Sequence, residues 1–398
     1  MLTDKKILLA VSGGIACYKS IEIMRQLQKK GAGVRVVMTP HATAFVQSMT
    51  FAAISGHPVY QEMFADETDG VIRHIDLAGW ADAVVIAPAT ANVIGKLACG
   101  IADDALTTLM MAVRAPVMVC PSMNTTMYES RAVQRNIDQL AADGFHLIEP
   151  DAGELACGVT GAGRLPEPGY IVNRLERLFY PKDFQGKKVL ITAGPTREAI
   201  DPVRYISNHS SGKMGYALAG AAEYRGADVT LVSGPTAEAL PPHVKRVDVE
   251  SAREMYDAVF DHLSHADVLI KVAAVADYRP AEVAEHKLKK SDEDRVLTLK
   301  KNPDILKSAG TAKAGPFLVG FAAETRNLKT YATKKIREKN LDMIVGNLVN
   351  APGSGFGSDT NTVTLFYKDG TEEALPNLSK QAVAHALLDR IGKRLSEK

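Results

Sequence analysis

The chain of 398 residues is 46% hydrophobic and 23% charged, with a formal net charge of +1. The length and composition are typical of a globular protein of two or three domains. A net charge near zero indicates no broad attraction to nucleic acid or to a membrane surface. No apolar stretch reaches the roughly 18 residues of a membrane span, and the apolar run near the N-terminus is too short for a secretory signal. The four scattered cysteines include no Cys-x-x-Cys pair. We therefore expect a cytoplasmic protein without a structural zinc site.

The first half alternates short apolar runs with segments of helical period. The first strand is followed by a helix that we expect to end at Gly31. We expect its buried face to carry Ile15, Tyr18, Ile21, Met24 and Leu27. Continuous apolar strands between helices indicate a parallel sheet with both faces covered. Strands are predicted at residues 7–11, 34–38, 82–87 and 117–120, and further helices at 92–99, 104–113 and 129–142.

Three of these strands end in small or polar residues, namely Ser12-Gly13-Gly14, Ala87-Pro88-Ala89-Thr90 and Pro121-Ser122-Met123-Asn124. In an open parallel sheet, ligands bind beyond the carboxyl ends of the strands. The three turns together therefore predict one phosphorylated cofactor, and the lack of a G-x-G-x-x-G pattern favours a mononucleotide. Each turn alone is also typical of simple packing, and Asn124 alone is typical of an Asx turn that caps a helix.

Residues 149–168 interrupt the pattern with four glycines around Cys157, and they are predicted to form a mobile loop or flap. Taken alone, Cys157 is also consistent with an incidental loop thiol. His74 lies in an amphipathic stretch before a buried strand, where a capped or exposed histidine is common. The polar segment 180–186 then suggests a boundary between domains at residues 1–181 and 186–398.

The second half repeats the alternation, so we expect two Rossmann-like α/β domains of three layers, each with a mostly parallel sheet. Residues 362–367 and the turn Asp369-Gly370 predict a late hairpin. Strands are predicted at 189–192, 228–232, 268–273, 317–321 and 343–345, and helices at 214–224, 252–263, 329–339 and 379–394.

The stretch 201–215, DPVRYISNHSSGKMG, concentrates polar side chains immediately before a helix. Free N–H groups and the helix dipole at such a place favour an anion. A solvated connection with a good N-cap is the alternative. Residues 286–301 form a basic run, which alone would be typical of a solvated surface strand.

The stretch 201–215, with ITAGPT before it and KVAAVADYRP after it, resembles the bacterial bifunctional coenzyme A enzyme family, the phosphopantothenoylcysteine decarboxylase/phosphopantothenate–cysteine ligases. The resemblance extends over the whole chain. It implies a flavodoxin-like N-terminal domain that binds FMN and a C-terminal nucleotide-dependent ligase domain. It also implies a homo-oligomer, a dodecamer of trimers formed by the flavin domain and dimers formed by the ligase domain.

The resemblance implies a role for particular residues in the first half. His74 matches the catalytic base, Cys157 the flap acid, and Asn124 and Met123 the substrate-binding residues. A thiol is mostly protonated at neutral pH and so suits the proton delivery expected of Cys157. Residues expected at FMN are Ser12, Gly13, Gly14, Thr39, Ala89, Thr90 and Asn92.

For the second half the resemblance implies ligation of cysteine to 4'-phosphopantothenate, with CTP as the nucleotide. Asn208 and Lys287 match catalytic residues, and Asp201 and Arg204 match substrate-binding residues. Asp277 is expected at CTP and also at Mg²⁺. Further residues expected at CTP are Ala273, Ala274, Val275, Lys287, Pro303, Asp304, Ile305, Leu306, Phe321, Lys335 and Lys339.

Two other functions compete with this interpretation. A flavin-binding regulatory protein without turnover is expected to lack one of His74, Asn124 or Cys157, and all three are present. A nicotinamide oxidoreductase built on two Rossmann-like halves is expected to carry G-x-G-x-x-G, which neither half has.

Overall fold

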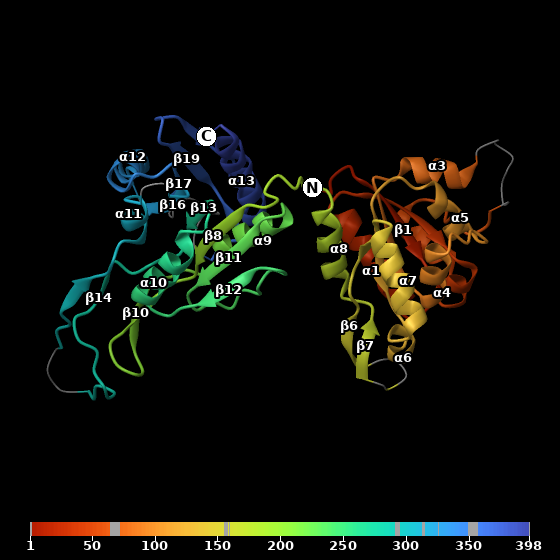
Figure 1. Ribbon diagram of the computed structural model, residues 1–398, viewed down its shortest axis with the longest axis horizontal. Coiled ribbons are helices and arrows are strands. Elements are labelled where there is room, and N and C mark those ends of the chain that lie inside the picture. The colour runs from red at the N-terminus through yellow and green to blue at the C-terminus, as the bar shows by residue number, and fades with distance from the viewer. Residues whose placement is uncertain are drawn as a thin grey trace. The chain divides into compact units, whose positions relative to one another are not determined.

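The computed structural model describes residues 2–63, 72–154, 158, 160–290, 295–312, 315–324, 326–348 and 357–397. The chain divides into two compact units, Met1–Tyr180 (unit 1) and Pro181–Lys398 (unit 2), and each consists of a central sheet between helices (Figure 1). The prediction of two α/β domains with mostly parallel sheets is confirmed.

Unit 1 is built on a five-stranded parallel sheet. Alternate side chains of the strand at residues 6–11 pack in two cores: Leu9 and Val11 lie on one face of the sheet, and Leu8 and Ala10 lie on the other. Both faces are buried, which explains the continuous apolar strand sequences. The strand order is β2 (Gly33–Met38), β1 (Lys6–Val11), β3 (Ala83–Ala89), β4 (Val117–Pro121) and β5 (His146–Leu147). The helices are α1 (Cys17–Lys29), α2 (Ser48–Ser55), α3 (Arg73–Trp80), α4 (Ala91–Ala98), α5 (Ala105–Ala112), α6 (Thr125–Tyr128), α7 (Arg131–Ala142) and α8 (Pro168–Arg177).

Helix α1 buries Met24 and Leu27 of the predicted face, but not its N-terminal part. Ile15 and Tyr18 are 63% and 60% exposed, and Ile15 precedes the helix. The buried residues are Cys17, Ser20, Ile23, Met24 and Leu27. The helical period was read correctly, but the stripe was placed wrongly at its N-terminal end because small side chains, not large apolar ones, contact the sheet there.

The glycine-rich segment 149–168, predicted to be a mobile loop or flap, contains two short paired strands, which is compatible with a flap. Its arms pair as an antiparallel hairpin, β6 (Asp151–Glu154) with β7 (Thr160–Arg164). Gly163 shows why glycine is needed: at φ +137° a Cβ here would lie 2.2 Å from the carbonyl oxygen of Met123. Cys157 lies outside the described residues.

Unit 2 contains an eight-stranded sheet that is parallel from β12 to β17 and antiparallel beyond. Helices α9 and α13 cover one face, and α10, α11 and α12 cover the other. The predicted hairpin is present as β19 with β20. The order is β12 (Lys245–Asp248), β11 (Asp228–Ser233), β8 (Lys188–Ala193), β13 (Val268–Lys271), β16 (Phe317–Glu324), β17 (Met343–Leu348), β19 (Val363–Tyr367) and β20 (Glu372–Ala374). The helices are α9 (Lys213–Tyr224), α10 (Ala252–Leu263), α11 (Ile305–Ala309), α12 (Leu328–Lys339) and α13 (Lys380–Ser396).

Three two-stranded ribbons are attached to this sheet, and two of them carry the polar segments singled out in the sequence. The ribbon β9 (Arg197–Ala199) with β10 (Tyr205–Ser207) spans the start of the polar stretch. The ribbon β14 (Tyr278–Pro280) with β15 (Leu299–Lys301) contains the end of the basic run. The third pairs β18 (Thr360–Asn361) with β21 (Leu378–Ser379).

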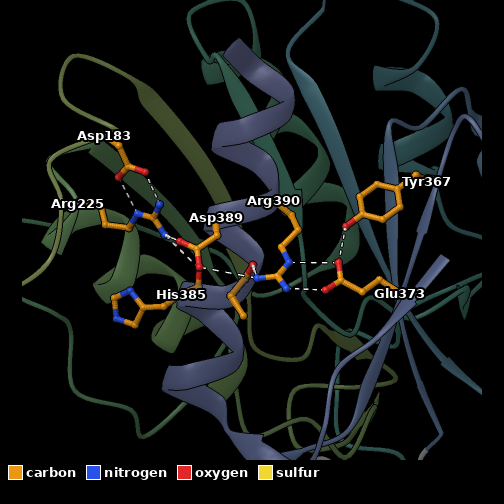
Figure 2. A network of polar contacts seen from close by, with 8 residues as sticks. Asp183, Arg225, Tyr367, Glu373, His385, Asp389 and Arg390 are labelled. Carbon is orange, nitrogen blue, oxygen red and sulfur yellow. Dashed lines mark hydrogen bonds and ion pairs between the residues drawn. The ribbon is translucent and has the colours of Figure 1, made fainter. Parts of the chain in front are cut away.

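A buried arginine ties the start of unit 2 to its C-terminal helix (Figure 2). The Arg225 side chain is 3% exposed and lies between Asp183 and Asp389. Its Nη1 donates to Asp389 Oδ1 at 2.7 Å, and its Nε donates to Asp183 Oδ1 at 2.8 Å. Phe184 lies beneath the guanidinium, 5.2 Å from the ring centroid.

Candidate functional site

Unit 1 has a cavity of about 900 Å³ at the carboxyl ends of β1, β3 and β4. It brings together the three turns that the sequence analysis placed at one ligand. Seven of the predicted residues line it: Gly13, Gly14, Thr39, Thr90, Asn92, Met123 and Asn124. Ile15, Tyr18, Lys19 and His41 also line it but were not predicted. The exposed positions of Ile15 and Tyr18 therefore have an explanation at this cavity rather than in the core.

Ser12 and Ala89, two further residues expected at the cofactor, are buried and do not line the cavity. The Ser12 hydroxyl donates to the Pro88 carbonyl oxygen at 2.7 Å and accepts from the Thr90 backbone N–H at 3.0 Å. Ser12 thus links the turn after β1 to the turn after β3 and fixes their relative position.

The turn after β1 packs tightly against the segment that carries His41. A Cβ on Gly13 would lie 2.5 Å from His41 Cβ, so this position accepts only glycine without a backbone shift. Thr39 Oγ1 is buried and has no hydrogen-bond partner among the residues that the structure describes. A bound ligand with polar atoms would satisfy such a hydroxyl.

Asn124 caps α6, because its Oδ1 accepts from the Thr126 N–H at 2.9 Å. The Asx-turn interpretation is therefore correct, and the same residue also lines the cavity. The hairpin closes the wall beside it, since the Met123 N–H donates to the Gly163 carbonyl oxygen at 3.0 Å. Glycines in a segment that packs backbone against backbone were the sequence signal for this wall.

His74 lies on α3 and is not among the described residues that line the cavity. Ile72 and Ile75 on either side of it are 61% and 52% exposed. The structure of a single chain thus brings the predicted FMN residues and Asn124 together, but it does not bring His74 to them.

Unit 2 has a cavity of about 560 Å³ near the carboxyl ends of β13 and β16. Nine residues predicted at the nucleotide line it: Val275, Asp277, Pro303, Asp304, Ile305, Leu306, Phe321, Lys335 and Lys339. Ala273, Ala274 and Lys287 do not line it. Lys335 and Lys339 share α12, and each pairs at 2.8 Å with a carboxylate, Glu324 and Asp304 respectively.

The loop 272–276 borders this cavity and is held by hydroxyl and amide side chains. Thr192 Oγ1 accepts from the N–H of Val272 at 3.2 Å and of Ala273 at 3.1 Å. Asn208 Nδ2 donates to the Ala274 carbonyl oxygen at 2.9 Å. The predicted catalytic Asn208 does not line the cavity, but it is fixed to the loop whose Val275 does.

Asp201 is buried, and its carboxylate accepts several hydrogen bonds from the protein itself. It accepts from the N–H groups of Val203, Arg204 and Leu288 at 2.8, 2.9 and 3.1 Å. It also pairs with the Arg204 guanidinium, and this side-chain hydrogen bond is the main reason that the pKa of Asp201 lies well below its usual range. Asp201 joins the polar stretch to the basic run, next to Lys287.

Lys271 was missed by the sequence analysis. It ends the apolar strand β13, lines the cavity, and donates from Nζ to the Ala273 carbonyl oxygen at 2.8 Å. Burial, with a smaller contribution from the positive charge of Lys339, lowers the pKa of Lys271 to about 8. A lysine as the last residue of a buried strand was the available signal.

The described residues contain no group of three or more His, Cys, Asp or Glu side chains placed to hold a metal ion. Over the same residues, no helix combines the length and apolar character needed to cross a membrane.

Comparisons with known proteins cover both units. Residues 1–179 match the family model "Flavoprotein", and residues 184–395 match "DNA/pantothenate metabolism flavoprotein C-terminal domain". The "Coenzyme A biosynthesis bifunctional protein CoaBC" of Bacillus subtilis (strain 168) is 51% identical over 98% of this chain and 97% of its own length. The protein of the same name from Escherichia coli (strain K12) is 48% identical over 100% of this chain and 99% of its own. A solved C-terminal domain of a CoaBC protein is 50% identical, covering 55% of this chain and 100% of that one, with a TM-score of 0.48.

Proposed function

The chain belongs to the family of bifunctional coenzyme A biosynthesis proteins and is an enzyme with decarboxylase and ligase activities, and we propose that unit 1 performs the first and unit 2 the second. The observation that carries this division is that each unit has its own cavity, lined by the residue types its chemistry needs. A regulatory flavoprotein without turnover would have no use for the second cavity.

In unit 1 we propose FMN-dependent decarboxylation of phosphopantothenoylcysteine to 4'-phosphopantetheine. Bound FMN supplies a two-electron acceptor that returns its electrons, so the reaction has no net redox change. Gly13 and Gly14 line the cofactor cavity, and the Thr39 hydroxyl, which has no partner among the described residues, offers the cofactor a hydrogen bond. Asn124 and Met123 bind substrate, His74 is the base for substrate oxidation, and Cys157 returns a proton after CO₂ has left.

We further propose that His74 reaches the cavity of another copy of the chain. Two observations support this arrangement: His74 is not among the described residues that line the cavity of its own chain, and Ile72 and Ile75 beside it are exposed. Exposed apolar side chains around a polar residue are typical of an interface between subunits. A homo-oligomer of trimers and dimers, as a cytoplasmic dodecamer, is the assembly we propose.

In unit 2 we propose that 4'-phosphopantothenate and cysteine are joined at the expense of CTP. The carboxylate of phosphopantothenate attacks the α-phosphate, pyrophosphate leaves, and the amine of cysteine then displaces CMP from the acyl-cytidylate. Lys335 and Lys339 bind phosphates, and Phe321 offers an apolar face. Asn208 and Lys287 orient the acyl phosphate, with Arg204 holding the segment that carries Lys287.

Mg²⁺ fits this site through Asp277. The carboxylate lines the cavity, and Mg²⁺ usually takes one or two carboxylates together with substrate phosphates and water rather than a full set of protein ligands. Asp277 on the protein side and the triphosphate on the other would form such a set.

One assay tests the whole proposal. Purified protein is given 4'-phosphopantothenate, cysteine and either CTP or ATP, and pyrophosphate and CO₂ are measured separately, together with the yellow flavin absorbance. We expect both products with CTP and far less pyrophosphate with ATP. Absence of pyrophosphate would reject the ligase, and absence of CO₂ from added phosphopantothenoylcysteine would reject the decarboxylase.

A further inference from the structure

Lys271 lies at the carboxyl end of β13, and the three residues before it in the strand are buried and apolar. Its side chain lines the cavity of unit 2. The strand is in the middle of the sheet, between β8 and β16, and Lys271 is half-buried at its end. Such a position is costly for a cation unless an anion is supplied.

Four other lysines line this cavity, of which Lys301 and Lys307 are exposed to solvent and Lys335 and Lys339 have anionic partners. Lys335 pairs with Glu324, and Lys339 pairs with Asp304. In the described part of the chain, the polar contact of Lys271 is with a carbonyl oxygen, that of Ala273, and it forms no ion pair. Of the three half-buried lysines of the cavity, Lys271 is thus the one without an ion pair among the described residues.

The charged groups that face Lys271 come from three neighbouring segments. Lys339 and Lys335 on α12 disfavour its charge, while Asp304 at the start of α11 and Asp277 in the loop after β13 favour it. Burial is the largest influence, and the balance holds the pKa of Lys271 at about 8. A polyanion placed among these lysines would add negative charge and reverse the balance.

We propose that Lys271 contacts the phosphates of the nucleoside triphosphate and that the neutral fraction of this lysine takes up a proton from solvent when the nucleotide binds. This inference rests on the proposed function of the cavity as the nucleotide site. Lys271 can bind a phosphate without losing an ion pair. Lys335 and Lys339 are already paired, so they bind a phosphate only if they leave or share their carboxylate partners.

Calorimetric titration of Mg²⁺–CTP into the full-length, flavin-loaded protein tests this, in buffers of different ionisation enthalpy at pH 7, 8 and 9. In the wild type, proton uptake per bound nucleotide should rise from near zero at pH 7 to about one half at pH 8 and more at pH 9. Lys271→Arg keeps a permanent charge, so it should bind with wild-type strength at pH 7 and show no such rise. Lys271→Met should show no rise and bind roughly 10–100-fold more weakly, as expected for a lost charged hydrogen bond.

Equal proton uptake by wild type and Lys271→Arg, or undiminished affinity of Lys271→Met, overturns the inference while leaving the nucleotide site in place. Failure of the wild type to bind CTP at all rejects the nucleotide site itself. Circular dichroism of both variants shows whether they fold, and the conservative Lys271→Arg keeps the test decisive should Lys271→Met be unfolded.

Discussion

The Asp201 carboxylate accepts a hydrogen bond from the Leu288 N–H at 3.1 Å, across 87 positions of sequence. Arg204 completes the link, because its Nη2 donates to the Leu288 carbonyl oxygen at 2.7 Å. The residue next to Leu288 is Lys287, so the same carboxylate that organises the polar stretch also fixes the backbone of the proposed catalytic lysine. We infer that Asp201 and Arg204 position Lys287.

Asp201→Asn should impair the ligase without touching the decarboxylase. The amide keeps the size of the side chain but cannot accept from all of the Asp201 donors and pair with the Arg204 guanidinium. Small displacements of a catalytic group can lower rates by about 10²-fold, so we expect pyrophosphate release to fall roughly 10–100-fold. The variant should stay yellow and release CO₂ from added phosphopantothenoylcysteine at the wild-type rate. Unchanged pyrophosphate release would mean that the link does not position Lys287.

Much of this architecture is predictable from sequence because it depends on local signals. Apolar segments followed by Gly, Pro or Asn predicted the parallel sheets. They also predicted the strand ends at which both cavities lie. The role of Asp201 was not predictable, since its partner Leu288 is distant in sequence and donates through the backbone. The exposed Ile15 and Tyr18 were misread for another reason: a cavity at the end of a helix needs the same apolar side chains as a core.

Gly13→Ala should abolish flavin binding, whereas Gly14→Ala should largely keep it. The added Cβ at Gly13 would lie 2.7 Å from the backbone carbon of His41, so the main chain has to move. The same atom at Gly14 would lie 3.4 Å from the Thr90 methyl group, an ordinary contact. The measurement is bound flavin per chain from absorbance, with thermal unfolding of unit 1 as the control for folding. Equal flavin content in the two variants would contradict the tight approach at Gly13.

Mixed oligomers test whether His74 acts on the cavity of another copy. His74→Asn and Asn124→Leu should each lose decarboxylation, because one lacks the base and the other lacks a substrate contact. Co-expressed, they should regain part of the activity, since the cavity of a His74→Asn chain can receive His74 from its Asn124→Leu neighbour. Ligase activity should persist throughout. No recovery in oligomers shown by mass spectrometry to be mixed would mean that both residues act within one chain.

Arg225→Lys should lower the free energy of unfolding of unit 2. Lysine keeps the charge but cannot bind Asp183 through two nitrogens while also reaching Asp389 (Figure 2). Because both carboxylates are partly exposed and can be rehydrated, we expect a loss of about 1–3 kcal/mol rather than more. The matched control is Arg253→Lys, whose pair with Asp257 is exposed and should contribute below about 1 kcal/mol. Similar losses in urea unfolding of the two variants would contradict the importance of burial here.

Lys271→Met should make unit 2 more stable at neutral pH, although it weakens nucleotide binding. The pKa of Lys271 is about 8 in the folded chain against 10.5 for an ordinary lysine, so between these values the unfolded chain binds more protons. The contribution of Lys271 to the free energy of unfolding therefore rises as the pH increases from about 8 to 10.5. Below pH 8 the lysine is charged in both states, and the whole cost of its charge in the folded chain lowers the free energy of unfolding. We expect Lys271→Met to unfold at higher urea concentration than wild type at pH 7, by a free energy on the order of 1–3 kcal/mol, and the difference to shrink by pH 10. Lys329→Met, which replaces an exposed lysine, should show no such narrowing. A wild type more stable than Lys271→Met at pH 7 would mean that the protein itself compensates the charge, and the lysine would then have no need of a phosphate.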